Sequence, residues 1–237
     1  MNPIFVINIG NSNTSYGVYH RDGVRDVQSL PTSAVSSDIV PAGMHVVIAS
    51  VVPEKLDIFL GFSPFTINHK NKLPIDFSGV DIESMGADRI ANFAALAEFA
   101  EFPAVCIDCG TAVTFEAVDK DGACTGGIIA PGRKLWRKSL HDYTALLPYL
   151  DDYATEEPDI LTGNTTESSM TVGCDAGILG MVEGLVSRFR KSLGADCRFF
   201  VTGGDAEFFL SNIPGLIPGG ADFTLRGIAA VYRYNQY

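Results

Sequence analysis

The chain has 237 residues, of which 46% are hydrophobic and 19% are charged, and this balance excludes an intrinsically disordered protein. Its 17 basic and 28 acidic residues give a net charge of −11 without a long basic run, which argues against a nucleic-acid partner. The sequence shows no signal-peptide pattern and no apolar run near the roughly 20 residues that span a bilayer, so we expect a cytoplasmic protein of one or two domains without a membrane partner.

The first half of the chain predicts a β-hairpin, a further strand and a helix. An apolar run at residues 4–7 enters a turn rich in Gly and Asn at 8–14 and returns through 15–19. Residues 45–51 predict a third strand. Apolar residues recur at helical spacing from about 87 to 100, which predicts an amphipathic helix there.

The same pattern of strand, glycine turn and strand begins again in the second half. Residues 104–108 predict an apolar strand, 109–111 a glycine turn and 112–118 an alternating return strand. A further hairpin leads into a strand at 124–130. Two copies of one phosphate-sized turn favour two related domains that face a shared cleft.

We place these domains at residues 1–102 and 103–237. The second would also hold a helix at about 171–193, a strand at 198–201 that runs into a glycine turn, and a helix at 222–234. The first of these helices carries glycine at 173, 177, 180 and 184, on one face. Each glycine costs about 1 kcal/mol in a helix interior. We therefore expect close approach of another helix, within the chain or across a dimer, while drift at a tolerant surface is the alternative.

Five cysteines make an odd count, which argues against a disulfide framework. Cys106 and Cys109 have C-x-x-C spacing, but residues three apart on a strand point to opposite faces. We expect buried, small hydrophobic side chains here rather than a redox or metal pair.

Three glycine turns predict a phosphate-binding site. The backbone amides of such turns bind phosphate oxygens, and Ser, Thr and Asn side chains add donors. Asp108 stands at a strand end, where its carboxylate could hold Mg²⁺ through water. The strand-to-helix turn at 202–204 would accommodate a nucleotide. A G-x-x-x-x-G-K-[ST] motif is absent from the sequence, which excludes a P-loop enzyme.

Asp88 and Arg89 stand at the opening of the helix predicted from 87. Asp88 could act as a general base on a substrate hydroxyl while Arg89 binds an anionic group. Alternatively, Asp88 complements the helix dipole beside an exposed arginine. Spacing alone leaves both interpretations open.

Five motifs in this order make the sequence resemble the type III pantothenate kinases, members of the actin-like, sugar-kinase superfamily of ATPases. Their D-x-G-N-[TS], G-A-D-R, D-x-G-T-A-x-T, G-G-x-I-x-P-G and T-G-G motifs are matched at residues 8–12, 86–89, 108–114, 126–132 and 202–204. The matches span nearly the whole chain, so their combination is specific.

The resemblance implies an α/β fold of two related actin-like (ribonuclease H-like) domains, each a mixed sheet with flanking helices, around a central ATP cleft. The implied activity is ATP-dependent phosphorylation of pantothenate to 4'-phosphopantothenate, the first step of coenzyme A biosynthesis. It also implies Mg²⁺ or another divalent ion, K⁺ or NH4⁺ as a monovalent cation, and a homodimer that completes the pantothenate pocket across its interface.

The resemblance also assigns roles to residues. Asp88 becomes the catalytic base, and Gly86, Asp88 and Arg89 contact pantothenate together with Thr165 and Thr166. Asp108 and Asn8 become metal-site residues. The implied ATP contacts are Asn8, Gly10, Asn11, Ser12, Asn13, Gly110, Thr111, Ala112, Thr202, Gly203 and Gly204.

Two motifs depart from the family pattern, at three positions. Asn8 stands where the family has an aspartate, so a neutral amide replaces a charge that offsets Mg²⁺. Gly79 and Ile82 replace a Tyr-x-x-Pro segment before G-A-D-R. The alternatives are therefore a catalytically weak or inactive kinase relative with a ligand-binding or regulatory role, and a different phosphotransferase or phosphatase of the superfamily.

Overall fold

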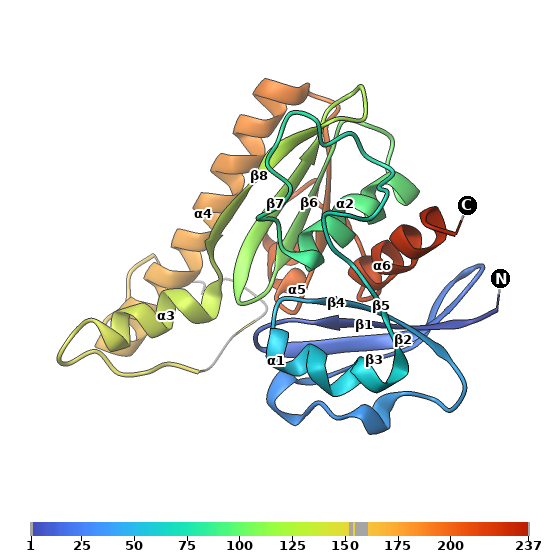
Figure 1. Cartoon of the computed structure of the whole chain (residues 1–237). Helices are drawn as coiled ribbons and strands as arrows, with labels where there is room; N and C mark the ends of the chain where they lie inside the picture. The colour runs from blue at the N-terminus through green and yellow to red at the C-terminus, as the bar shows by residue number, and fades with distance from the viewer. Residues whose placement is uncertain (1, 152–153, 155–160, 237) are drawn as a thin grey trace. The chain divides into compact units, whose positions relative to one another are not determined.

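The computed structural model describes residues 2–151, 154 and 161–236, and it contains all the strands and helices expected from the sequence (Figure 1). The strands are β1 (Ile4–Ile9), β2 (Asn13–His20), β3 (Gly23–Pro31), β4 (His45–Ser50), β5 (Phe65–Thr66), β6 (Ala104–Cys109), β7 (Ala112–Val118), β8 (Cys124–Pro131), β9 (Arg198–Thr202) and β10 (Ile217–Pro218). The α-helices are α1 (Pro53–Leu56), α2 (Ala87–Phe99), α3 (Arg133–Asp142), α4 (Thr166–Leu193), α5 (Ala206–Asn212) and α6 (Phe223–Tyr234). The 3-10 helices are η1 (Thr32–Ala34), η2 (Ser37–Ile39) and η3 (Asp57–Phe62).

The chain forms two compact units. Unit 1 consists of Met1–Phe102, Glu116–Gly126 and Gly220–Tyr237, and unit 2 of Pro103–Phe115 and Gly127–Gly219. Compared with the expected domains, 1–102 and 103–237, this division places the tip of the β7–β8 hairpin and the helix α6 with the first part of the chain. The reason for α6 is its packing, because it contacts α2 and β1 extensively.

The sheet of unit 1 has the order β3-β2-β1-β4-β5. β1 pairs with β2 in an antiparallel and with β4 in a parallel arrangement, so Asn8 lies between Ser15 and Ala49. Side chains alternate between the two faces of a strand. Val6 therefore joins the core under α2 and α6, and Asn8 points to that same face.

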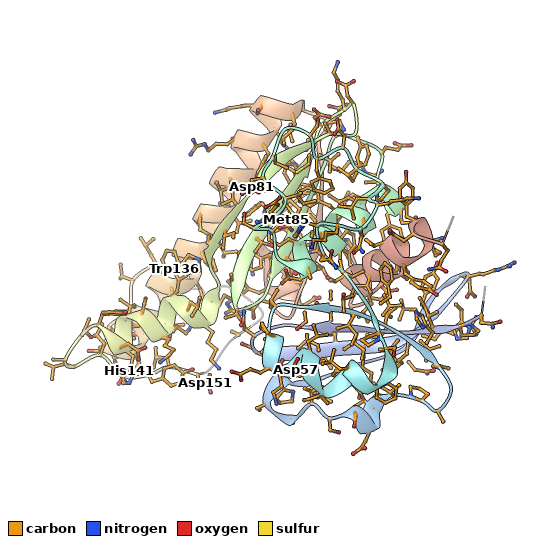
Figure 2. The ribbon with its side chains drawn as sticks, in the orientation of Figure 1. Asp57, Asp81, Met85, Trp136, His141 and Asp151 are labelled. Atoms are coloured by element: carbon orange, nitrogen blue, oxygen red, sulfur yellow. The ribbon has the colours of Figure 1, made fainter. Side chains whose placement is uncertain are left out.

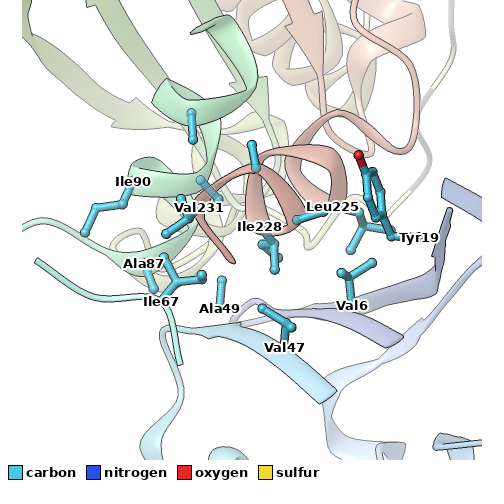
Figure 3. Close-up of a cluster of buried hydrophobic side chains, with 14 of the residues drawn as sticks. Val6, Tyr19, Val47, Ala49, Ile67, Ala87, Ile90, Leu225, Ile228 and Val231 are labelled. Carbon is cyan, nitrogen blue, oxygen red and sulfur yellow. The ribbon is translucent and has the colours of Figure 1, made fainter. Parts of the chain in front are cut away.

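Two hydrophobic cores cover the faces of this sheet. On one face, Val6 and Val47 pack against Ile90 of α2 and Ile228 of α6, as Figure 3 shows. On the other, Phe5, Ile7 and Ile48 pack around the fully buried Phe59 of η3, among others. Because both faces of β1 are buried, its carboxyl end is held in a fixed place.

The α2–α6 contact depends on Gly227, since a Cβ there would lie 1.9 Å from the carbonyl oxygen of Ala91. We expect Gly227→Ala to lower the free energy of unfolding by about 3 kcal/mol, because one helix must move away from the other. Urea unfolding measures the change. Gly79→Ala is the matched control, because a Cβ at the exposed Gly79 meets no atom of the described chain within 4 Å. Equal stability of the two variants would contradict the close crossing.

The second sheet repeats the first, strand for strand. Its order is β10-β9-β6-β7-β8, so β6 occupies the place of β1, with a hairpin partner on one side and the parallel strand β9 on the other. β1 and β6 even share one burial pattern, in which only the fifth residue, Asn8 or Asp108, is partly exposed. The internal repeat predicted from the two glycine turns is thus confirmed in the arrangement of the strands.

By length and composition alone, the helix α4 is apolar enough to cross a membrane. This is weak evidence, since the core helix of a soluble protein passes the same test. Within unit 2, Phe189 of α4 packs against Phe115 of β7 and Phe199 of β9, with ring centroids 5.8 and 6.5 Å apart. The helix therefore covers a face of the second sheet.

Close packing occurs at one point of the α4 glycine stripe. At Gly177 a Cβ would lie 2.9 Å from the ring of Trp136 of α3, which Figure 2 labels. At Gly173, Gly180 and Gly184 a Cβ would meet nothing within 4 Å among the described residues. The expected close approach of another helix is confirmed only at Gly177. All five cysteines are free and buried, which confirms the burial expected for Cys106 and Cys109.

Candidate active site

The first phosphate loop, residues 8–13, joins β1 to β2 as a tight turn. The backbone N–H of Gly10 donates to the carbonyl of Asn13 at 3.0 Å. Thr32, which sequence reasoning missed, braces the turn, because its hydroxyl donates to the carbonyl of Gly10 at 2.7 Å and its N–H to that of Ser12 at 2.9 Å. Asn11, Ser12 and Asn13 are exposed. The predicted loop therefore presents its polar residues to solvent on a fixed backbone.

Asn8 carries a buried polar atom. Its side-chain oxygen Oδ1 is buried and has no hydrogen-bond partner among the described residues. A buried acceptor without a partner is costly, so such an atom marks a place where a ligand completes the contacts. A neutral amide oxygen is a ligand that Mg²⁺ accepts. The position thus fits the predicted metal site in chemistry, although without a charge.

Asp88 lies at the end of the unit 1 sheet where β1 and β4 terminate, the end that carries the first phosphate loop. The N–H of Val51 donates to the carbonyl of Ile9 at 3.0 Å, which extends the β1–β4 pairing beyond the strand ends. Gly86, directly before α2, packs on Val51, since its Cβ would lie 3.4 Å from Val51 Cγ1. The N-terminus of α2 is therefore next to the carboxyl ends of β1 and β4, the usual place for ligands in α/β sheets.

The G-A-D-R motif has a local physical reason. A Cβ at Gly86 would lie 2.7 Å from Oδ1 of Asp88, so only glycine leaves the carboxylate in its place. That oxygen accepts the backbone N–H of Arg89 at 2.8 Å. Burial raises the pKa of Asp88, while this hydrogen bond and the nearby Arg89 charge partly offset the rise. A carboxylate with a raised pKa is a suitable general base.

Arg89 is anchored by Glu116, a residue that sequence reasoning missed. The guanidinium Nε donates to Oε1 of Glu116 at 2.8 Å, and the Glu116 side chain is fully buried. The Arg89 side chain keeps 17% of its surface exposed. One signal was present in the sequence, because Glu116 is the single acidic residue of the return strand predicted at 112–118. The alternative interpretation of Arg89 as an exposed arginine is thus wrong, because its side chain is largely buried against Glu116.

In unit 2, the second phosphate loop, residues 108–111, joins its strands with one residue fewer than the first. The N–H of Gly110 donates to the carbonyl of Ala112, two residues on, at 2.9 Å, whereas Gly10 donates to Asn13, three residues on. Asp108 is partly exposed at the end of β6. A partly exposed carboxylate at this place also fits the chemistry of a Mg²⁺ ligand. Because Asn8 belongs to unit 1 and Asp108 to unit 2, their pairing at one metal ion stays a prediction.

The T-G-G turn packs directly on this second loop. Gly203 has φ +95°, and a Cβ there would lie 2.5 Å from the carbonyl oxygen of Cys109 and 2.6 Å from Oδ1 of Asp108. The N–H of Asp205 donates to the same Cys109 carbonyl at 2.9 Å. The sequence motifs at 108–111 and 202–204 are therefore brought together, and glycine at 203 is required by both conformation and space.

The turn at Pro131 and Gly132 also packs against the second phosphate loop. A Cβ at Gly132 would lie 2.1 Å from the Gly110 carbonyl oxygen, and the Gly132 N–H donates to the carbonyl of Thr111 at 3.0 Å. Gly132 was part of a matched motif, but no role was expected for it. Its role in the structure is to let the start of α3 touch the second phosphate loop.

A buried charge cluster follows Gly132. Arg133 and Arg137 of α3 both bind the carboxylate of Asp175 of α4, with nitrogen–oxygen distances of 2.8 to 3.2 Å. Another Arg133 nitrogen lies 4.0 Å from Asp205, beside the T-G-G turn. Burial raises the pKa of Asp205, and the charge of Arg133 opposes the rise. This cluster, which sequence reasoning missed, ties the two helices to the nucleotide turn.

Thr165 and Thr166 form the start of α4, five residues before the predicted one. The Thr165 hydroxyl accepts the N–H of Ser168 at 3.1 Å and the Ser168 hydroxyl accepts the N–H of Thr165 at 3.0 Å, which is a capping box. Both threonines are exposed and line a hollow of about 650 Å³ together with Asn164 and Ser169. The second phosphate loop is not among the residues that line this hollow.

Comparison with known proteins identifies the family. The family model for type III pantothenate kinases matches residues 4–188. A type III pantothenate kinase of Methylacidiphilum infernorum is 34% identical over 96% of this chain and 87% of its own, and one of Rhodospirillum rubrum is 31% identical over 98% and 99%.

A solved structure supports the fold. A Campylobacter jejuni protein assigned to the Baf family of transcriptional activators superposes with a TM-score of 0.60 at 18% identity, over 98% of both chains. The expected fold class, two related mixed sheets with flanking helices, is confirmed. The five motifs, the repeated sheets and the family match agree, and the chain belongs to the type III pantothenate kinase family.

Proposed function

We propose that this protein transfers the γ-phosphoryl group of ATP to the primary hydroxyl of pantothenate, giving ADP and 4'-phosphopantothenate, the first step of coenzyme A biosynthesis. The observation that carries the proposal is the start of α2. There a partly buried carboxylate and an anchored guanidinium lie at the same end of the sheet as the first phosphate loop.

Each group has a defined task in this reaction. Asp88 accepts the proton of the hydroxyl as its oxygen forms a bond to the γ-phosphorus, and the bond from that phosphorus to the β,γ-bridging oxygen breaks. Arg89 binds the pantothenate carboxylate through charge-assisted hydrogen bonds. Backbone N–H groups of the two phosphate loops hold ATP oxygens, and Thr202, Gly203 and Gly204 line the nucleotide.

A divalent ion such as Mg²⁺ would be held by Asp108 and by the buried side-chain oxygen Oδ1 of Asn8. When bound, it supplies positive charge to the transferring phosphoryl group. We further propose a monovalent cation, K⁺ or NH4⁺, and a cytoplasmic homodimer with no nucleic-acid or membrane partner. The exposed Thr165 and Thr166 would then serve the pantothenate pocket of the dimer, as the resemblance implies.

The direct test is turnover. Purified protein, given pantothenate, Mg-ATP and K⁺, is expected to form 4'-phosphopantothenate, detected by mass spectrometry. Absence of product across divalent and monovalent ions would contradict the proposal. Binding of ATP and pantothenate in calorimetry without product would indicate the inactive relative, and turnover of other hydroxy acids alone would indicate a different phosphotransferase.

Asn8→Asp tests the metal site. We expect the Mg²⁺ concentration for half-maximal turnover to fall about tenfold, because a carboxylate adds a charge at the oxygen that is now a neutral amide. Titration of turnover with Mg²⁺ measures it. Asn11→Asp adds the same charge at an exposed position of the same loop, and we expect no such decrease there. A similar response in both variants would place the metal elsewhere.

A further inference from the structure

Glu116 is a buried carboxylate for which the proposed reaction has no task. It lies in β7 with a fully buried side chain, between Phe115 and Ala117, which are also buried. Placing a carboxylate there is costly unless a cation pairs with it. Its cation is Arg89, 27 residues earlier in the chain, at 2.8 Å.

Asp88, the neighbour of Arg89 in sequence, is a second carboxylate on which the Arg89 charge acts. The Asp88 carboxylate accepts the backbone N–H of Arg89 at 2.8 Å, and among the described residues the structure records no ion pair between the two side chains. The guanidinium instead donates to Glu116. The described contacts of the Arg89 guanidinium are therefore with Glu116, while Asp88 interacts with its charge without an ion pair.

The same contact prepares Arg89 for an anion. A guanidinium has five N–H donors in one rigid plane, and holding Nε fixes that plane. The remaining N–H groups then have a defined direction, and part of the side chain is exposed, 17% of its surface. A fixed plane lowers the entropy lost when a ligand carboxylate binds.

We propose that Glu116 is a positioning residue that holds the Arg89 guanidinium oriented toward the carboxylate of the substrate, so that the preference for an acid over its neutral analogue depends on Glu116. The inference rests on the proposed function. It adds that selectivity is set by a side chain that never touches the substrate.

The test compares two ligands and three variants. Calorimetry gives the Kd, and kinetics the KM and kcat, for pantothenate and for pantothenamide, in which a neutral amide replaces the carboxylate. We expect Glu116→Gln, in which the side chain keeps nearly the same shape, to weaken pantothenate binding about tenfold or more and pantothenamide binding less than about twofold. In an Arg89→Ala background, Glu116→Gln should weaken pantothenate no further, since the two residues act as a unit.

Glu98→Gln is the matched control. Glu98 belongs to α2 and pairs with Arg233 of α6, and both side chains are partly exposed. We expect neither ligand to be affected there. Glu116→Asp, which keeps the charge on a shorter stem, should recover part of the discrimination, and thermal unfolding confirms that each variant is folded.

The outcomes separate the two proposals. Equal weakening of both ligands, additive losses with Arg89→Ala, or no effect of Glu116→Gln beyond the control would overturn the role of Glu116. If Arg89→Ala changes the binding of pantothenate and of pantothenamide equally, the proposed roles of Arg89 and Glu116 are both overturned. If the wild-type protein binds pantothenate without turning it over, and Glu116→Gln selectively weakens that binding, the role of Glu116 is supported and the kinase reaction is overturned.

Discussion

Asp88→Asn is expected to lower kcat by about three orders of magnitude and to leave the protein folded. Asparagine keeps the shape and can still accept the N–H of Arg89, but it cannot take a proton from the substrate hydroxyl. General base catalysis contributes about 10²- to 10⁴-fold, which sets the expected size. Single-turnover measurements with pantothenate and Mg-ATP would report the loss at the chemical step.

The pH dependence gives a second readout. Burial raises the pKa of Asp88, so the acidic limb of kcat/KM in the wild type should lie above the range of an ordinary aspartate, about 3.9. Activity is lost as the pH falls through this raised pKa, because the base becomes protonated. Asp88→Asn should lose this limb along with most of the activity. A limb at the ordinary position, or a kcat within about tenfold of wild type, would show that another group is the base.

The thermal stability of Asp88→Asn should rise near neutral pH, although its activity falls. A raised pKa means that the folded state prefers the protonated carboxyl, so the ionised form opposes folding at neutral pH. The Tm of Asp88→Asn should therefore exceed that of wild type near pH 7. The difference should vanish below the unfolded pKa, about 3.9, where both states are protonated. A lower Tm at pH 7 would indicate that the ionised carboxylate stabilises the fold.

Local patterns predicted most of the backbone. The hairpins β1–β2 and β6–β7 follow from an apolar run, a glycine turn and an alternating return, which are properties of neighbouring residues. The helix expected from 87 to 100 is found at Ala87–Phe99 for the same reason. The repeated turns also predicted the repeated sheets, because each turn follows the central strand of its sheet.

The supports of the site could not be predicted, because they join distant parts of the chain. Arg89 pairs with Glu116 across 27 residues, and Arg133 with Asp175 across 42. Periodicity shows which face of an element is buried, but not which charge meets it from another element. The helix α4 shows the same limit, since its glycine stripe is plain in the sequence but only Gly177 has a packing partner within the described chain.

Asp175→Asn is expected to lower the free energy of unfolding by about 3 to 5 kcal/mol. Asp175 and Arg137 are fully buried and Arg133 nearly so. Two guanidinium groups share this one carboxylate, and its loss would leave both buried cations without the charge that they share. Urea unfolding measures the change. Asp142→Asn is the control on the same helix pair, because its contact with Lys138 is exposed and should be worth under about 1 kcal/mol.

Asp175→Asn should also weaken nucleotide binding. Arg133 lies with its guanidinium 3.7 Å from the ring centre of Phe208 and 4.0 Å from Asp205, so it connects Asp175 to the turn that follows β9. Without Asp175, Arg133 is expected to move toward Asp205 and to disturb the backbone that packs on the second phosphate loop. Calorimetry with ADP should show weaker binding in Asp175→Asn than in Asp142→Asn at a temperature where both are folded. Asp175→Glu keeps the charge, and a loss of stability in it as large as in Asp175→Asn would show that packing rather than charge pairing holds α3 to α4.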